Sequence, residues 1–238
     1  MMKQYKECYI AVIDLLGFKA ALEVLECDDI MGIFNEINDE YIISHNAADQ
    51  AIIERDDLHV KVMSDTICIY VETGVKNALS ALIAICDYLQ VRLLRLKKPM
   101  LSRGAIVKGQ IYHEDDILFG PGFVKAYLLE EKEAIYPRII IGEEALAEYE
   151  STDYVGQDYI DRFVISDFDG KIISDYLYLF YGLNHTQESW RRFACGVYAA
   201  LNNETNERIR QKYQYIYDSF PRIQKKFCSK TKELPNHA

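Results

Sequence analysis

The chain has 238 residues, of which 50% are apolar, 27% are charged, 12 are glycine and 5 are proline. This composition is that of a folded globular protein and excludes a disordered or collagen-like chain. The 27 basic residues against 37 acidic ones give a net charge of −10, which opposes general attraction to nucleic acid or to an anionic membrane. The length exceeds one typical domain without reaching two, so we expect one full domain with an extension.

The sequence predicts neither a membrane span nor export. The most apolar run, residues 81–86, is soon followed by Asp87 and Arg92. Charged residues stand near the N-terminus, where a signal peptide needs an apolar segment. The six cysteines form no CxxC pair and lie mostly in apolar runs, which is typical of reduced core residues and not of zinc ligands. We therefore expect a cytoplasmic protein that binds neither a membrane nor nucleic acid.

Apolar spacing and turn residues predict a regular order of strands and helices. In chain order these are a strand at 9–14, a helix at 30–41, a polar loop at 44–57, a hairpin of strands at 58–63 and 66–71, a helix at 75–97, a strand at 101–112, a helix at 120–131, a strand at 138–141, an antiparallel pair within 163–180, and helices at 188–201 and 204–220. This order is typical of an α+β fold with a ferredoxin-like sheet and flanking helices. We expect one domain over residues 1–182 and a C-terminal helical extension over 183–238.

Asp14 and Asp65 are the candidates for chemistry. Asp14 ends the first buried strand and Asp65 lies at the tip of the hairpin, so pairing of central strands would bring the two carboxylates together. Mg²⁺ and Mn²⁺ prefer carboxylate oxygen, and two such ions can activate a hydroxyl group and neutralise a triphosphate. The pair therefore indicates phosphoryl or nucleotidyl transfer. Taken singly, each aspartate is better explained as a solvated strand-end or turn residue.

The sequence motifs around both aspartates resemble those of the class III nucleotidyl cyclases. The family's D-x-x-G-F motif after an apolar strand matches 13–18 (IDLLGF), and its lysine four residues before a hairpin aspartate matches 61–65 (KVMSD), with Ser64 where glycine is usual. The R-x-G-I-x-x-G strand is similar to 103–109 (RGAIVKG), and the G…A…L-E segment to 120–130. The resemblance implies the class III cyclase sheet for this chain, with the catalytic domain at 1–182.

A closer resemblance extends to about residue 179. The words IDLLGF, SDTI, RGAI, FGPG…AYLLE and YPRI, and D-x-D-G followed by DYL, are similar to the bacterial anti-phage pyrimidine cyclases of the Pycsar systems. This resemblance implies that UTP is converted to cyclic UMP and pyrophosphate, and that the product signals to a separate effector protein. Cytidylate or adenylate cyclase activity is the alternative. The class III family also implies a homodimer whose sites are assembled from two chains.

The resemblance assigns roles to particular residues. The carboxylates of Asp14 and Asp65, with the Leu15 carbonyl, would hold two Mn²⁺ or Mg²⁺ ions, and Arg103 would contact phosphate as the third catalytic residue. Lys61 would point toward the base, because period two places it on the strand face of Asp65. Backbone N–H groups in the turn before a helix would hold the β- and γ-phosphates; this turn comprises Leu16, Gly17 and Phe18.

The match has one gap, which keeps a different function open. Class III enzymes carry an asparagine and an arginine on the helix after the G…A motif, and the matching positions here are Val124 and Leu128. Neither can orient a ribose or stabilise a charge, although Arg138 is a candidate for the missing cation. A catalytically degenerate module that binds a nucleotide and regulates a partner is therefore an alternative. A third alternative is a different enzyme that uses two aspartates on a polymerase-like palm domain. The sequence lacks the GG[DE]EF signature of the cyclic-dinucleotide synthases, which also have such a sheet.

Overall fold

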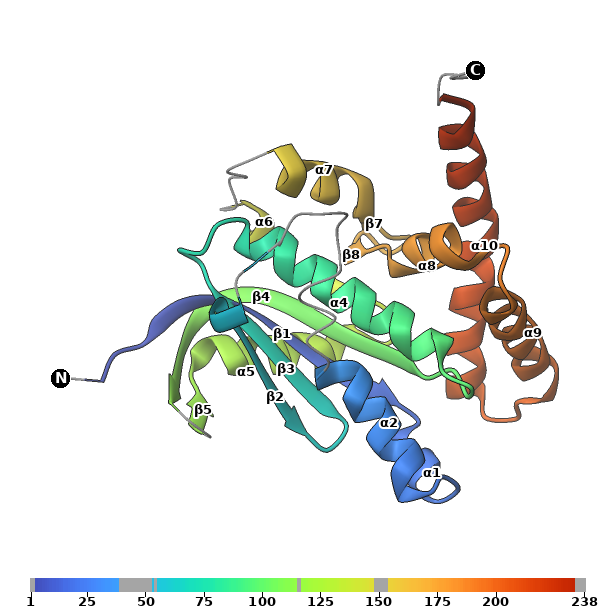
Figure 1. The fold of residues 1–238 in the computed structure, drawn as a ribbon, viewed down its shortest axis with the longest axis horizontal. Coiled ribbons are helices and arrows are strands. Elements are labelled where there is room, and N and C mark those ends of the chain that lie inside the picture. Colours follow the sequence, from blue (N-terminus) through green and yellow to red (C-terminus); the bar gives the residue numbers. More distant parts are fainter. Residues whose placement is uncertain (1–2, 39–52, 54, 115–116, 148–153, 234–238) are drawn as a thin grey trace.

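The computed structural model describes residues 3–38, 53, 55–114, 117–147 and 154–233 (Figure 1). Most of the loop predicted at 44–57 lies outside these residues. The strands are β1 (Lys6–Leu16), β2 (Leu58–Met63), β3 (Thr66–Glu72), β4 (Leu101–Glu114), β5 (Ile117–Phe119), β6 (Ile139–Ile141), β7 (Val164–Ser166) and β8 (Ile172–Ser174). The helices are α1 (Phe18–Leu22), α2 (Cys27–Asn38), the 3₁₀ turn η1 (Arg55–Asp57), α4 (Ala78–Arg95), α5 (Pro121–Glu133), α6 (Glu143–Ala147), α7 (Tyr154–Phe163), α8 (Tyr176–Asn184), α9 (Glu188–Asn203) and α10 (Glu207–Glu233).

The strands form one sheet in the order β2-β3-β1-β4-β6-β8-β7, with β5 paired to β4. β1 is antiparallel to both β3 and β4, and β2 is antiparallel to β3. Strands joined as β-α-β-β-α-β and arranged in this order form the ferredoxin-like sheet. The predicted α+β fold with flanking helices is therefore confirmed. β6 extends the sheet by pairing in parallel with β4, and β8 and β7 follow it.

Helices cover both faces of the sheet, which explains why the first strand is apolar without interruption. Tyr9, Ala11 and Ile13 face α4 and belong to the largest apolar core. Ile10 and Val12 point to the other face and pack in a second cluster with Ala126 of α5. Figure 1 shows α4 on one side of β1 and β4 and α5 on the other. A strand buried on both faces needs apolar residues at every position.

α5 lies so close to β4 that two glycines make the contact possible. A Cβ atom at Gly109 would lie 2.6 Å from the Gly122 Cα atom, and one at Gly122 would lie 2.7 Å from the Ile10 side chain. Glycine is required at both positions because no side chain fits between the two backbones. This contact fixes the depth at which α5 lies on the sheet.

The last three helices and the end of α4 share a further apolar core, which includes Phe180, Phe193, Ile216 and Ile223. The helix expected to end at residue 220 continues through Pro221 to Glu233. Proline removes one helical hydrogen bond, but tertiary contacts on both sides of it stabilise the continuous helix. The division expected at residue 182 falls within α8 and stays a prediction. None of the described helices is long and apolar enough to span a membrane.

Candidate active site

The sheet register places Asp14 and Arg103 directly opposite each other. Asp14 of β1 pairs with Thr66 of β3 on one side and with Arg103 of β4 on the other. Side chains of directly paired residues lie on the same face of a sheet. This face is the one that α5 covers, since Val12, two residues before Asp14, packs in the α5 cluster. The aspartate and the arginine predicted to act together are therefore neighbours.

The β2–β3 turn brings Asp65 beside the end of β1. The Leu15 N–H group donates a hydrogen bond of 2.9 Å to the Asp65 carbonyl oxygen. Ser64, which precedes Asp65 in the turn, has a φ of 60°. A side chain is strained in this left-handed region and glycine is not, which explains why related motifs carry glycine there. The two segments that carry the predicted metal ligands thus meet through their backbones.

Arg103 is held by two carboxylates and a carbonyl group. Its Nε atom donates a hydrogen bond of 3.1 Å to Asp14 Oδ2 and lies 2.9 Å from Glu130 Oε1, while Nη1 donates to the Ala134 carbonyl at 3.2 Å. Nε carries one hydrogen, and its geometry directs it to Asp14, so the Glu130 contact is one of charge only. Arg103 therefore neutralises Asp14 in this conformation.

Glu130 is a member of the site that the sequence analysis did not single out. It lies on α5 and is 4% exposed. Burial raises its pKa to about 7, the Arg103 guanidinium opposes this shift, and the Asp14 carboxylate adds to it. The only sequence signal was its place in the G…A…L-E motif, because a buried glutamate within a run of acids looks like a solvated one.

Lys61 lies on the same face as Asp14, one row further from the turn. It pairs with Cys68 of β3, which in turn pairs with Val12 of β1. The strands β3 and β1 lie between Lys61 of β2 and Arg103 of β4.

In the predicted phosphate-binding turn, hydrogen-bonding groups come from the backbone and not from side chains. Gly17 has φ 80° and ψ 10° and leads directly into α1. The Phe18 ring is buried, with its centroid 5.7 Å from that of Phe34, and Leu16 packs against the core of the C-terminal helices. The side chains of this turn therefore offer no hydrogen-bonding group to a polar ligand, and the Leu16 backbone is paired with Leu101 in the β1–β4 ladder.

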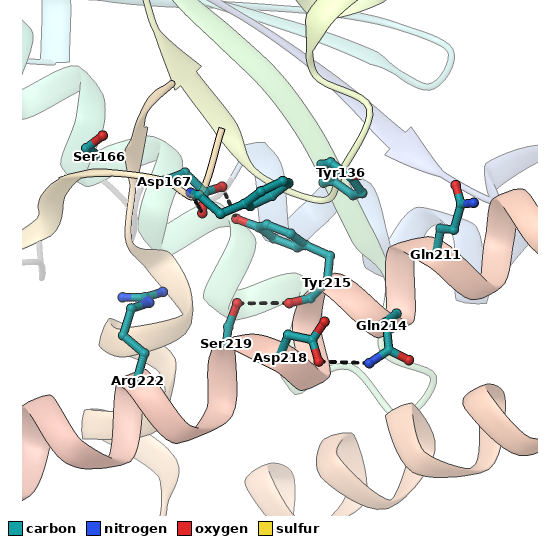
Figure 2. Close-up of a pocket in the computed structure, with 10 residues that line it drawn as sticks. Tyr136, Ser166, Asp167, Gln211, Gln214, Tyr215, Asp218, Ser219 and Arg222 are labelled. Carbon is teal, nitrogen blue, oxygen red and sulfur yellow. Dashed lines mark hydrogen bonds between the residues drawn. The ribbon is translucent and has the colours of Figure 1, made fainter. Parts of the chain in front are cut away.

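Arg138, the candidate for a replacement cation, is engaged elsewhere through its two Nη groups. It is 1% exposed and forms ion pairs with Asp167 and Asp169. Three aromatic rings surround its guanidinium at 5.3 to 5.7 Å, those of Tyr136, Phe168 and Tyr215. Tyr136 and Tyr215 also line a cavity next to α10 (Figure 2). This cavity has a volume of about 590 Å³, and none of the predicted site residues is among the ten residues that line it. Arg138 is therefore a structural residue.

Lys212 of α10 is a second residue that the sequence analysis did not single out. Its side chain is half-buried. Burial and the nearby Arg103 guanidinium lower the pKa of Lys212, while the Asp14 carboxylate acts in the opposite direction. The ammonium group therefore lies within electrostatic reach of both residues. In the sequence, Lys212 belongs to a mixed basic and aromatic run that gives no sign of this position.

The α5 positions matched to the family's asparagine and arginine are exposed and apolar. Val124 is 52% exposed and Leu128 is 39% exposed. Neither side chain carries a hydrogen-bonding group, so the gap inferred from the sequence persists in three dimensions.

The donor set suits a hard divalent ion. Among the described residues, no three histidine, cysteine, aspartate or glutamate side chains gather as a metal-binding group. Two carboxylates and backbone carbonyls are what Mg²⁺ or Mn²⁺ uses when water and substrate phosphates complete its coordination. Asp14 and Asp65 stand on segments that meet through their backbones, and their oxygen atoms are of the kind that such ions prefer.

The chain is similar to solved cyclase structures, with low sequence identities and low TM-scores. No protein-family model and no curated protein sequence matches the chain. The guanylyl cyclase Cya2 is 15% identical, with 73% of this chain and 93% of that chain covered and a TM-score of 0.47. A rhodopsin-guanylyl cyclase core of converted specificity, solved with ATPαS, is 14% identical, with coverage of 71% and 96% and a TM-score of 0.48. An adenylate/guanylate cyclase/hydrolase from Silicibacter pomeroyi is 16% identical, with coverage of 72% and 96% and a TM-score of 0.46. Values this low do not transfer a function from one protein to another.

Proposed function

We propose that the chain is a metal-dependent nucleotidyl cyclase of the class III kind that acts on a pyrimidine nucleoside triphosphate. One observation carries the proposal: the hydrogen bond from Leu15 to the Asp65 carbonyl joins the two aspartate segments, and Arg103 lies on the Asp14 carboxylate beside them. Two acids and a cation at the end of central strands suit the neutralisation of a triphosphate.

In the proposed reaction, the ribose 3′-oxygen forms a bond to the α-phosphorus, and the bond from that phosphorus to the bridging oxygen breaks. Pyrophosphate and one proton are released. Two Mg²⁺ or Mn²⁺ ions held by Asp14, Asp65 and the Leu15 carbonyl would supply charge neutralisation and acidify the 3′-hydroxyl. Arg103 would turn from Asp14 to phosphate oxygens, and the N–H groups of the 16–18 turn would hold the β- and γ-phosphates.

Lys61 is the proposed contact to the base. An ammonium group only donates hydrogen bonds, so it suits acceptors such as uracil O4, uracil O2, cytosine N3 or adenine N1, and it suits guanine N1–H poorly. The preference for UTP over CTP and ATP rests on the resemblance to the pyrimidine cyclases. The same resemblance supports a cytoplasmic role in anti-phage defence, in which cyclic UMP activates a separate effector protein.

A homodimer is part of the proposal. The exposed apolar side chains of α5, among them Val124, Tyr127 and Leu128, lie on the helix that also carries Glu130. A second copy of the chain would remove such side chains from water.

The experiment is to incubate the pure protein with Mn²⁺ and each of the four nucleoside triphosphates and to identify the products by mass. We expect cyclic UMP from UTP, with CTP and ATP far behind. An Asp65→Asn protein measured in parallel excludes a contaminating cyclase. Much faster cyclisation of ATP would contradict the pyrimidine assignment, and no cyclic product from any triphosphate would contradict the enzyme.

The exposed Val124 and Leu128 favour a second candidate, a nucleotide-binding regulatory module without turnover. Such a module would bind a nucleoside triphosphate with Mn²⁺ in calorimetry and return it unchanged after prolonged incubation. Detection of pyrophosphate release excludes this candidate.

A further inference from the structure

Lys212 lies on the inward side of α10. The buried residues of this helix include Tyr215, Ile216, Ser219 and Ile223. Residues three and four apart lie on one side of a helix, so Lys212 begins this buried stripe at its N-terminal end. Within the part of the chain that the structure describes, its ammonium group makes no hydrogen bond or ion pair. A lysine without a partner at such a position costs free energy unless something anionic joins it.

The apolar cluster around α10 shows which end of the sheet this helix lies near. Tyr215 and Ile216 share a cluster with Leu16 at the end of β1 and Leu101 at the start of β4. These two leucines stand two residues from Asp14 and from Arg103, and α10 runs past this end of the sheet (Figure 1). The turn of α10 that carries Lys212 therefore lies at the edge where the proposed active site opens.

The charges at this edge favour a polyanion. Arg103 and Lys212 are two cations near the Asp14 carboxylate, and Arg103 also contacts Glu130. Two cations that face the same region from different elements repel each other until phosphate oxygens enter between them. α5, which would be expected to supply a cation, presents Val124 and Leu128.

Resting on the proposed function, we infer that Lys212 is a further substrate-binding residue, which contacts the phosphate groups of the nucleoside triphosphate opposite Arg103. The C-terminal helical extension is thereby part of the active site. Lys212 provides from α10 a positive charge that α5 does not carry at Val124 or Leu128.

The test measures binding of inorganic tripolyphosphate with Mg²⁺ by calorimetry. Lys212→Met removes the charge and keeps the apolar stem that packs beside the core. We expect its dissociation constant to rise about tenfold or more, the usual effect of losing one charge-assisted contact. Lys212→Arg should recover most of the affinity. Lys225→Met, an exposed lysine on the same helix, should bind within about twofold of the unchanged protein, and melting curves establish that each variant is folded.

The outcomes separate this inference from the proposed function. Tripolyphosphate binding that depends on Lys212, in a protein that cyclises no nucleotide, supports the inference and overturns only the cyclase. Unchanged tripolyphosphate binding by folded Lys212→Met protein overturns the inference even if UTP is cyclised. An unchanged protein that binds no tripolyphosphate overturns it as well.

Discussion

The hydroxyl group of Tyr159 donates a hydrogen bond of 2.8 Å to Asp87, whose carboxyl group is fully buried in the middle of α4. Ser174 also donates to this carboxyl group. α7 and β8, which follow the ferredoxin-like core in the chain, are thus attached to the main helix of that core through one acidic residue.

This carboxyl group makes the stability of the protein depend on pH. Burial raises the pKa of Asp87 from 3.8 to about 7, although its two hydroxyl partners act against the shift. Between pH 4 and pH 7 the folded protein retains the Asp87 proton that the unfolded chain has lost. The contribution of this proton to the free energy of unfolding is therefore complete below pH 4 and is lost as the pH rises through 7.

Asp87→Asn should remove this dependence. Chemical denaturation from pH 4 to pH 8 measures it, and the free energy of unfolding of the variant should fall less with rising pH than that of the unchanged protein. Asp161→Asn, at an exposed position on α7, is the control. Parallel pH profiles for Asp87→Asn and the unchanged protein would show that Asp87 does not hold its proton.

Asp14→Asn and Asp65→Asn should each reduce turnover by about a hundredfold or more, because each substitution removes one carboxylate charge from the proposed active site. Folding should be retained in both, since asparagine preserves the shape of the side chain. Initial rates with Mn²⁺ and circular dichroism measure the two effects. A folded variant with near-normal turnover would contradict the assignment of that residue.

Ser64→Gly should stabilise the protein by about 1 kcal/mol, because glycine adopts the observed φ of 60° without the strain that a side chain meets there. The free energy of unfolding from urea titration is the measurement. Gly17→Ala, at φ 80° in open space, provides the opposite substitution and should destabilise. A destabilised Ser64→Gly protein would mean that the serine side chain contributes more than its strain.

Arg138→Met should destabilise the fold by about 3 to 5 kcal/mol, because it leaves the carboxylates of Asp167 and Asp169 without their common buried partner. Lys125→Met breaks an exposed ion pair with Glu144 and should change stability by less than about 1 kcal/mol. Thermal melting of the two variants compares them. Equal melting temperatures would remove the structural role given to Arg138.

Much of the fold was predictable because its signals are local. The apolar run at 9–14, the turn at Ser64-Asp65 and the Asp-Gly turn at 169–170 each produced the expected element. α8 was missed because its nearly continuous apolar and aromatic residues have no helical period, as its burial on several sides requires. The prediction that α10 ends at 220 was wrong because contacts distant in sequence outweigh one proline.

The candidate site was predictable only where a motif marks it. Recognisable sequence motifs contain Asp14, Asp65 and Arg103. The pairing of β1 with β3 and β4 brings these three segments together. Lys212 reaches the same place from the other end of the chain, through the packing of α10. No spacing in a single sequence reveals such a contact.

The central position of β1 has a consequence for the making of this protein. Both strands that pair with β1 lie later in the chain, and β4 ends only at Glu114. Until β4 is made, the backbone edge of β1 that pairs with it is open to other nascent chains. We therefore expect fragments that end before β4 to expose this unpaired strand edge and to aggregate.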